Sequence, residues 1–156
     1  MTKKILLNLN ILTFTILLFS FHGKAQKMKN LENVYKTELE NGTWITDRIL
    51  GLDPNIKQYN LTKFIERKFA GNLTSFGDKI IFNSSYVAPC GNDKFTTVIG
   101  KYEFFDKEKI IISVDTVTYS GEWKKPTEYR KPKQLIFLIS KVDETIVFTK
   151  QSDKKN

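Results

Sequence analysis

The chain has 156 residues, with 25 lysines and arginines against 17 aspartates and glutamates, which gives a formal net charge of +8. This length suits one domain, and a content of 40% hydrophobic and 27% charged residues is typical of a folded globular protein rather than a disordered chain. A single cysteine and a single histidine exclude a disulfide framework within the chain and a Cys/His zinc site of the usual kind.

The first 25 residues have the three parts of a secretory signal peptide. Lys3 and Lys4 form a basic start, an apolar stretch covers residues 5–21, and Gly23 and Ala25 are small residues at positions −3 and −1 for cleavage after Ala25. An uncleaved membrane anchor is the alternative, but an apolar stretch of 17 residues with two asparagines is short for a span of about 20. We therefore expect an exported protein, periplasmic or extracellular, that is not transmembrane after processing.

Processing changes both the charge and the available chemistry. Cleavage removes three lysines and His22, so 131 residues remain with a net charge of +5 and no histidine. Catalytic triads and metal sites that need an imidazole are then excluded. No spacing of carboxylates indicates a catalytic pair. We expect no catalytic residues, no metal, no cofactor and no enzymatic activity.

The mature chain starts with a predicted helix and a predicted strand. Apolar residues at helical spacing predict a short helix over residues 31–40, which Asn41 and Gly42 would end. Alternation then predicts a strand over residues 43–50. Residues 54–69 allow two interpretations. One is a helix that begins at Asp53-Pro54, and the other is a strand over residues 61–69.

The remainder of the chain has the pattern of short strands. We predict a turn at Gly77-Asp78, a loop over residues 88–93 and a long connection over residues 121–133, and strands over residues 73–76, 79–86, 95–105, 110–119, 134–142 and 145–150. Strands joined by short turns pair as antiparallel neighbours, and closure into a barrel leaves no exposed edges.

The predicted fold class is mainly β. We expect an antiparallel up-and-down β-barrel of about eight strands, with a short N-terminal helix and a second helix after the first strand as an open alternative. The expected organisation is a signal peptide over residues 1–25, one domain over residues 26–150 and a polar tail over residues 151–156.

Gly42-Thr43-Trp44 stands at the start of the first predicted strand, directly after the short helix. This resembles the G-x-W signature of lipocalins and related calycin barrels, and the layout over residues 31–150 is similar to small secreted bacterial lipocalin-like domains. The resemblance implies a Trp44 packed across the closed end of a barrel whose mouth admits small apolar ligands. The family's Asp-x-Tyr element is not evident, and no arginine follows Arg130 to stack on the tryptophan from the last strand. Lys150 could take that place, although a lysine lacks the flat guanidinium that stacks well.

Aromatic residues supply the candidate ligand-binding positions. The apolar faces of the strands could either line a cavity or fill a solid core, and they carry Trp44, Val98, Tyr102, Phe104, Ile112, Val114, Phe137, Ile139 and Phe148. Tyr86, Tyr119 and Trp123 lie near loop ends, where an aromatic ring with a polar tip suits the rim of a pocket. The candidate ligand-binding residues are therefore Trp44, Tyr86, Tyr102, Tyr119 and Trp123.

Two further features bear on partners. A basic patch of Lys124, Lys125, Arg130, Lys131 and Lys133 is interleaved with aromatic residues and could bind an anionic surface, although export makes nucleic acid an unexpected partner. Cys90 could link two chains through a disulfide in an oxidising compartment. The sequence favours a binding protein for a small apolar or amphipathic molecule. The alternative is a cell-envelope interaction, inhibitor or immunity-type module with a filled barrel.

Overall fold

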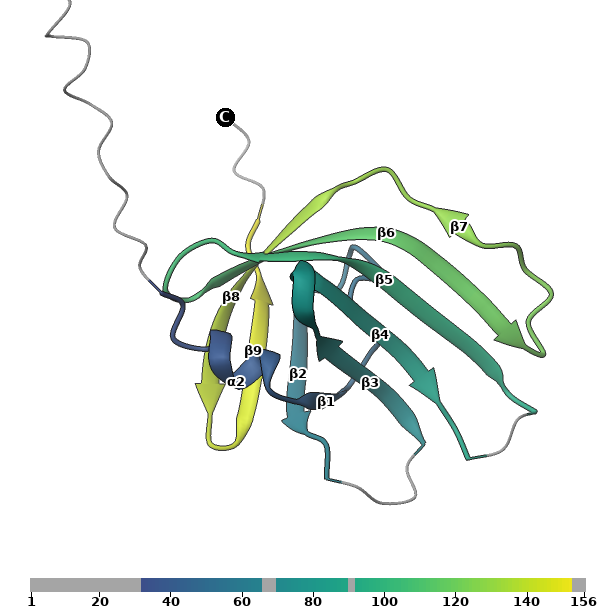
Figure 1. Cartoon of the computed structure of the whole chain (residues 1–156), viewed down its shortest axis with the longest axis horizontal. Helices are drawn as coiled ribbons and strands as arrows, with labels where there is room; N and C mark the ends of the chain where they lie inside the picture. Colours follow the sequence, from purple (N-terminus) through teal and green to yellow (C-terminus); the bar gives the residue numbers. More distant parts are fainter. Residues whose placement is uncertain (1–31, 66–69, 90–91, 153–156) are drawn as a thin grey trace, which may run out of the picture. The chain divides into compact units, whose positions relative to one another are not determined.

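The computed structural model describes residues 32–65, 70–89 and 92–152, so the predicted signal peptide, Cys90 and the last four residues lie outside the described ranges (Figure 1). Within these ranges no helix combines the length and the apolar character that a membrane crossing needs. The elements are a helix α2 (Lys36–Glu40), a 3₁₀ turn η1 (Asp78–Ile80) and the strands β1 (Thr43–Thr46), β2 (Gln58–Lys63), β3 (Gly71–Phe76), β4 (Ile81–Val87), β5 (Lys94–Phe104), β6 (Lys109–Gly121), β7 (Glu128–Tyr129), β8 (Gln134–Val142) and β9 (Thr145–Lys150).

The described strands form one antiparallel sheet whose pairings close into a ring. The order is β5-β4-β3-β1-β2-β9-β8-β6-β7, and β5 also pairs with β6 (Figure 1). The two-residue strand β7 lies outside the ring, because it pairs only with β6 beyond the point where β8 leaves that strand. The predicted mainly β class with antiparallel neighbours and a short first helix is confirmed.

The predicted up-and-down order holds only in part. From β3 to β6, and again from β8 to β9, consecutive strands are neighbours. However, β1 lies between β2 and β3, and β2 pairs with β9 on its other side. Strands β2 and β3 therefore flank β1, and each pairs antiparallel with it. The position of β2 in the sheet, between β1 and β9, is therefore set by its pairing with β9 near the end of the chain and not by chain order alone.

The first helix is shorter than predicted. Only Lys36–Glu40 are helical, and residues before Lys36 form a turn. The side chain of Asn33 explains this difference, because its amide donates to the Asp106 carbonyl over 2.7 Å while its oxygen accepts from the Tyr35 backbone amide over 2.9 Å. Such local side-chain bonds offer the backbone an alternative to helix.

The helix interpretation of residues 54–69 is wrong for residues 54–65, and residues 66–69 lie outside the described ranges. Asp53 and Pro54 begin a turn, in which Asp53 Oδ1 accepts from the Asn55 amide over 2.8 Å. A strand follows, as in the other interpretation, but it covers residues 58–63. Tyr59 and Leu61 are buried inside the ring and their neighbours are more exposed, so burial follows the period of a strand.

Two other boundaries differ from prediction. The first strand ends at Thr46 rather than at residue 50, because Leu50 turns inward and becomes fully buried. The turn between β3 and β4 covers residues 77–80 rather than two residues, and Lys79 and Ile80 have positive φ angles of 62° and 60°. The strands predicted at residues 134–142 and 145–150 are confirmed, as are β5 and β6 to within two residues.

Aromatic and aliphatic side chains fill the ring. All of the predicted apolar-face residues are buried except Phe104, which is partly buried against the others. Trp44 is 1% exposed, and its Nε1 donates to the Leu39 carbonyl over 3.1 Å, which ties β1 to the end of α2. Close packing of this kind makes large deletions costly.

We predict that Trp44→Ala destabilises the domain by about 3–5 kcal/mol, as expected for loss of a large buried aromatic side chain. The measurement is the free energy of unfolding in urea. Trp123→Ala is the control, because Trp123 is only partly buried, and we expect it to cost less than half as much. Near-neutral stability of Trp44→Ala would contradict a core role for this residue.

Candidate functional site

A segment of the chain enters the ring at the end away from α2. Strand β1 starts beside α2 and leads away from it to residues 47–57, within which residues 49–52 turn inward; we call residues 49–52 the plug segment. Leu50 is 0% exposed, and its backbone amide donates to Ser84 Oγ over 2.8 Å. Ser84 Oγ also lies 2.7 Å from Thr74 Oγ1, so the buried hydroxyl that accepts from the Leu50 amide is itself held by a hydroxyl on β3.

Gly51 fits inside the ring because it has no side chain. A Cβ atom at this position would lie 2.7 Å from Val114 Cγ2, closer than van der Waals contact allows, with Phe82 and Val98 next nearest. Its φ of +78° is also in the left-handed region that glycine adopts at little cost. The Gly51 amide donates to the Tyr59 hydroxyl over 3.3 Å, and burial raises the pKa of that phenol.

Arg130 ties the plug segment to the connection between β6 and β8. Its Nη1 donates to the Leu52 carbonyl over 2.8 Å and to the Gly51 carbonyl over 3.3 Å. Its backbone amide donates to the Asp115 carbonyl on β6 over 2.9 Å. The guanidinium therefore fixes the distance between the plug and residues 128–133.

The Glu128 carboxylate pairs with this arginine, and the Tyr119 hydroxyl holds the carboxylate in turn. Tyr119 donates to Glu128 Oε1 over 2.5 Å, and Glu128 Oε2 lies 3.4 Å from Arg130 Nη2. The Tyr119 hydrogen bond, followed by the bond from Arg130, lowers the pKa of the Glu128 carboxyl. The same bond to Glu128 raises the pKa of Tyr119. Glu128 is therefore ionised at neutral pH and engaged with these two partners.

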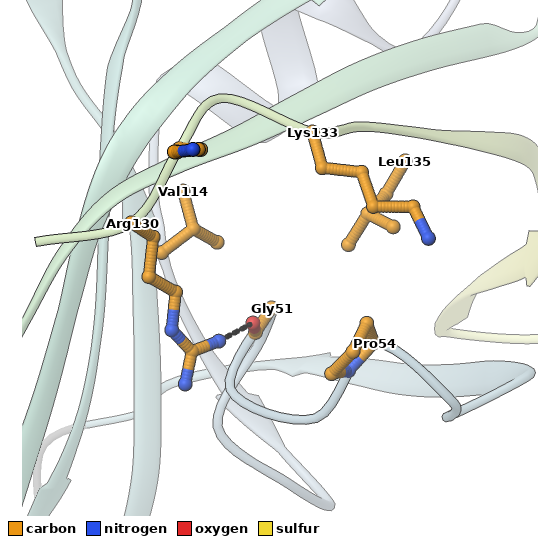
Figure 2. Close-up of a pocket in the computed structure, with 7 residues that line it drawn as sticks. Gly51, Pro54, Val114, Arg130, Lys133 and Leu135 are labelled. Carbon is orange, nitrogen blue, oxygen red and sulfur yellow. Dashed lines mark hydrogen bonds between the residues drawn. The ribbon is translucent and has the colours of Figure 1, made fainter. Parts of the chain in front are cut away.

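A cleft of about 360 Å³ opens between the plug segment and the connection, and we call it the plug cleft (Figure 2). It is lined by Gly51, Pro54, Val114, Arg130, Lys131, Lys133 and Leu135. Figure 2 shows Val114 and Leu135 pointing into the gap, with Arg130 and Lys133 on opposite sides of it. The volume lies within the range of about 300–1,000 Å³ that small-molecule sites occupy.

The plug cleft combines an apolar floor with a cationic rim. Val114 and Leu135 are 5% and 4% exposed and come from neighbouring strands of the ring. None of its lining residues is acidic. Lys131 and Lys133 are exposed, and neither side chain makes a hydrogen bond or ion pair within the described ranges. These two ammonium groups are available to a ligand, whereas Arg130 is already committed to the plug.

Three of the predicted residues form a separate cluster near the end of β6. The rings of Tyr119 and Trp123 meet edge to face at 5.7 Å, and Lys125 Nζ lies 4.6 Å from the Trp123 ring centre. Lys94 Nζ lies 5.4 Å from the same ring. The lysines therefore cover this aromatic pair through cation–π contacts.

The other predicted ligand-binding residues do not meet at one place. Trp44 and Tyr102 are buried near α2, where the Tyr102 hydroxyl donates to Glu40 Oε1 over 2.9 Å. Tyr86 donates to Asp93 Oδ2 over 2.9 Å and packs on Phe95. None of the five aromatic candidates lines the plug cleft. The basic patch is also divided, because Arg130, Lys131 and Lys133 line the cleft while Lys124 and Lys125 do not.

Comparisons with protein-family models, with curated proteins and with solved structures found no match. The site must therefore be interpreted from its own geometry. Among the described residues no group of three or more histidine, cysteine, aspartate or glutamate side chains is placed to hold a metal ion. An apolar floor below two unengaged ammonium groups can bind a molecule that has an apolar part and an anion.

Sequence reasoning missed the apolar half of the cleft. Val114 was predicted as an apolar-face residue, but Gly51, Pro54 and Leu135 were not singled out. The inward turn of the plug segment has only a weak signal, a glycine between two leucines (Leu50-Gly51-Leu52) at the end of the predicted strand.

We predict that Gly51→Ala destabilises the domain by about 2–4 kcal/mol, because the new methyl group overpacks against Val114 and alanine is strained at positive φ. Urea unfolding measures the change. Gly77→Ala is the matched control, since Gly77 has a φ of −99° and a Cβ there would lie no nearer than 3.6 Å to the Ile81 carbonyl oxygen. Equal stability of the two variants would contradict the plug geometry.

Proposed function

We propose that this chain is an exported, non-enzymatic binding protein that holds a small amphipathic anion in the plug cleft. The observation that carries the proposal is the pairing of buried Val114 and Leu135 with the unengaged ammonium groups of Lys131 and Lys133. An acyl or other apolar chain would remove the floor from water, and its anionic head would meet the two lysines. The signal-peptide pattern of residues 1–25 supports export.

We place the ligand beside the plug rather than in the centre of the ring. Side chains of the core and the plug segment occupy that centre, and Leu50 of the plug segment is completely buried there. A ligand inside the ring would have to displace Leu50 and break its amide bond to Ser84. Binding in the plug cleft needs no such rearrangement.

For the fold we propose a lipocalin-like barrel. The closed ring of strand pairings and the buried Trp44 at the start of β1 support it. The order β2-β1-β3 departs from the strict up-and-down order of that family. Residues of the plug segment fill the space that a ligand would occupy in a hollow barrel.

A second candidate function is a cell-envelope interaction module. Exposed apolar side chains on the turns near α2 favour it: Val34, Ile80, Phe105 and Val142 are between 54% and 65% exposed. Such residues on neighbouring turns suit a protein partner. Under this candidate a disulfide dimer through Cys90 is a further prediction, which a non-reducing gel would test.

We predict that decyl phosphate binds the purified mature protein and that Lys131→Gln combined with Lys133→Gln weakens binding by about tenfold, the equivalent of 1.4 kcal/mol for two charge-assisted contacts. Isothermal titration calorimetry below the micellar concentration measures the affinity. The matched control is Lys101→Gln combined with Lys124→Gln, which changes the charge equally at exposed positions outside the cleft.

Decanol and inorganic phosphate are control ligands: decanol has the apolar chain without the anion, and phosphate has the anion without the chain. We expect each to bind much more weakly than decyl phosphate, because each can use only the floor or only the lysines. No binding of decyl phosphate, or equal losses in the two double variants, would contradict the proposed function.

A further inference from the structure

A second cleft, of about 570 Å³, lies next to the plug cleft, and we call it the C-terminal cleft. It is lined by Asn55, Lys57, Lys150, Gln151 and Ser152. Two amides, a hydroxyl and two ammonium groups make this lining polar, and it contains no carboxylate. Its chemistry therefore differs from the plug cleft, which has an apolar floor.

Residues that are adjacent in the structure line the two clefts. Pro54 lines one and Asn55 the other, and consecutive Cα atoms are about 3.8 Å apart. On the opposite wall Leu135 lines the plug cleft, while Gln151 of the C-terminal cleft donates its backbone amide to the carbonyl of the next residue, Ile136, over 2.8 Å. One molecule of modest length can therefore reach both.

Two hydrogen bonds of Lys150 lie where the two clefts meet, and we call this place the ridge. Lys150 Nζ donates to the Pro54 carbonyl over 2.7 Å, and the Lys150 backbone amide donates to the Lys57 carbonyl over 2.7 Å. Lys150 is thereby engaged with the protein. Lys57 is exposed, and its side chain has no hydrogen bond or ion pair in the part of the chain that the structure describes.

Among the described residues, no carboxylate forms an ion pair with Lys57, Lys131 or Lys133. Asp53 is the nearest acidic residue along the loop, and its Oδ1 already accepts from the Asn55 amide. Glu128 is engaged by Tyr119 and Arg130. The unengaged cations are therefore Lys131 and Lys133 on one side of the ridge and Lys57 on the other.

We propose that the two clefts are subsites for one ligand, an apolar chain on a polar head that carries two anionic groups. This inference rests on the proposed function, because the apolar chain and the first anion occupy the plug cleft. The second anion meets Lys57, and the hydrogen-bonding spacer between the anions lies along Asn55 and Gln151. Acylated acidic peptides and acylated sugar phosphates share this chemistry.

The test uses acyl peptides that differ in one charge. N-decanoyl-Asp-Gly-Gly has two carboxylates, and its C-terminal amide lacks the distant one. Across three residues the carboxylates can be separated by roughly 10 Å. We expect the wild-type protein to bind the diacid three- to fivefold more tightly than the amide, which is the range of a single exposed ion pair.

Lys57→Gln should remove this preference and leave the affinity for the amide unchanged. Lys63→Gln is the matched control, because Lys63 is an exposed lysine on β2 that lines neither cleft, and the preference should persist. A monoacylated sugar bisphosphate, compared with its monophosphate, forms the second arm. A Lys57-dependent preference in only one arm identifies the source of the ligand.

Different results would contradict the proposed function and the two-subsite inference. If neither peptide binds, or binding ignores Lys131 and Lys133, the proposed function fails. If both peptides bind with equal affinity and depend on Lys131 and Lys133, the function stands and the two-subsite inference is overturned. A preference for the diacid that survives Lys57→Gln overturns it as well.

Discussion

The absence of a side chain at Gly51 is the constraint on which the candidate site depends. Because no Cβ stands between the backbone and Val114, residues 49–52 can enter the ring and Leu50 can fill it. The hydroxyls of Ser84 and Tyr59 then accept from the Leu50 and Gly51 amides, which would otherwise carry the cost of unpaired polar atoms. The plug segment helps to fill the interior of the ring, and the plug cleft lies beside it at the edge.

The cationic residues that line this cleft differ in whether the protein already engages them. Arg130 has the rigid fork of donors that suits two neighbouring carbonyl groups, and it holds the plug in place. Lys131 and Lys133 have flexible side chains and no protein partner in the described ranges, so they are free to meet an anion. Position in the connection, rather than charge alone, separates the structural cation Arg130 from the two lysines that we propose bind a ligand.

The sequence predicted what local patterns encode. Strands β5, β6, β8 and β9 alternate clearly, and most of them pair with a neighbour in the chain, so their bounds follow from the residues. The place of β2 and the strand β7 depend on distant pairings, which no local pattern contains. Likewise the basic residues of the cleft lie in one stretch of sequence, residues 130–133, and could be recognised there. Its apolar residues come from three separate parts of the chain. The five aromatic candidates do not meet at one place, because burial near α2 and separate tyrosine hydrogen bonds distribute them around the ring.

The most direct test of this account is a map of amide chemical-shift changes in ¹⁵N-labelled protein on titration with decyl phosphate. We expect the changes to centre on Gly51, Val114, Lys131 and Leu135, which line the plug cleft, with Trp44 and Tyr102 unaffected at the α2 end. Changes centred on Trp44 and Tyr102, or no changes at saturating decyl phosphate, would contradict binding beside the plug.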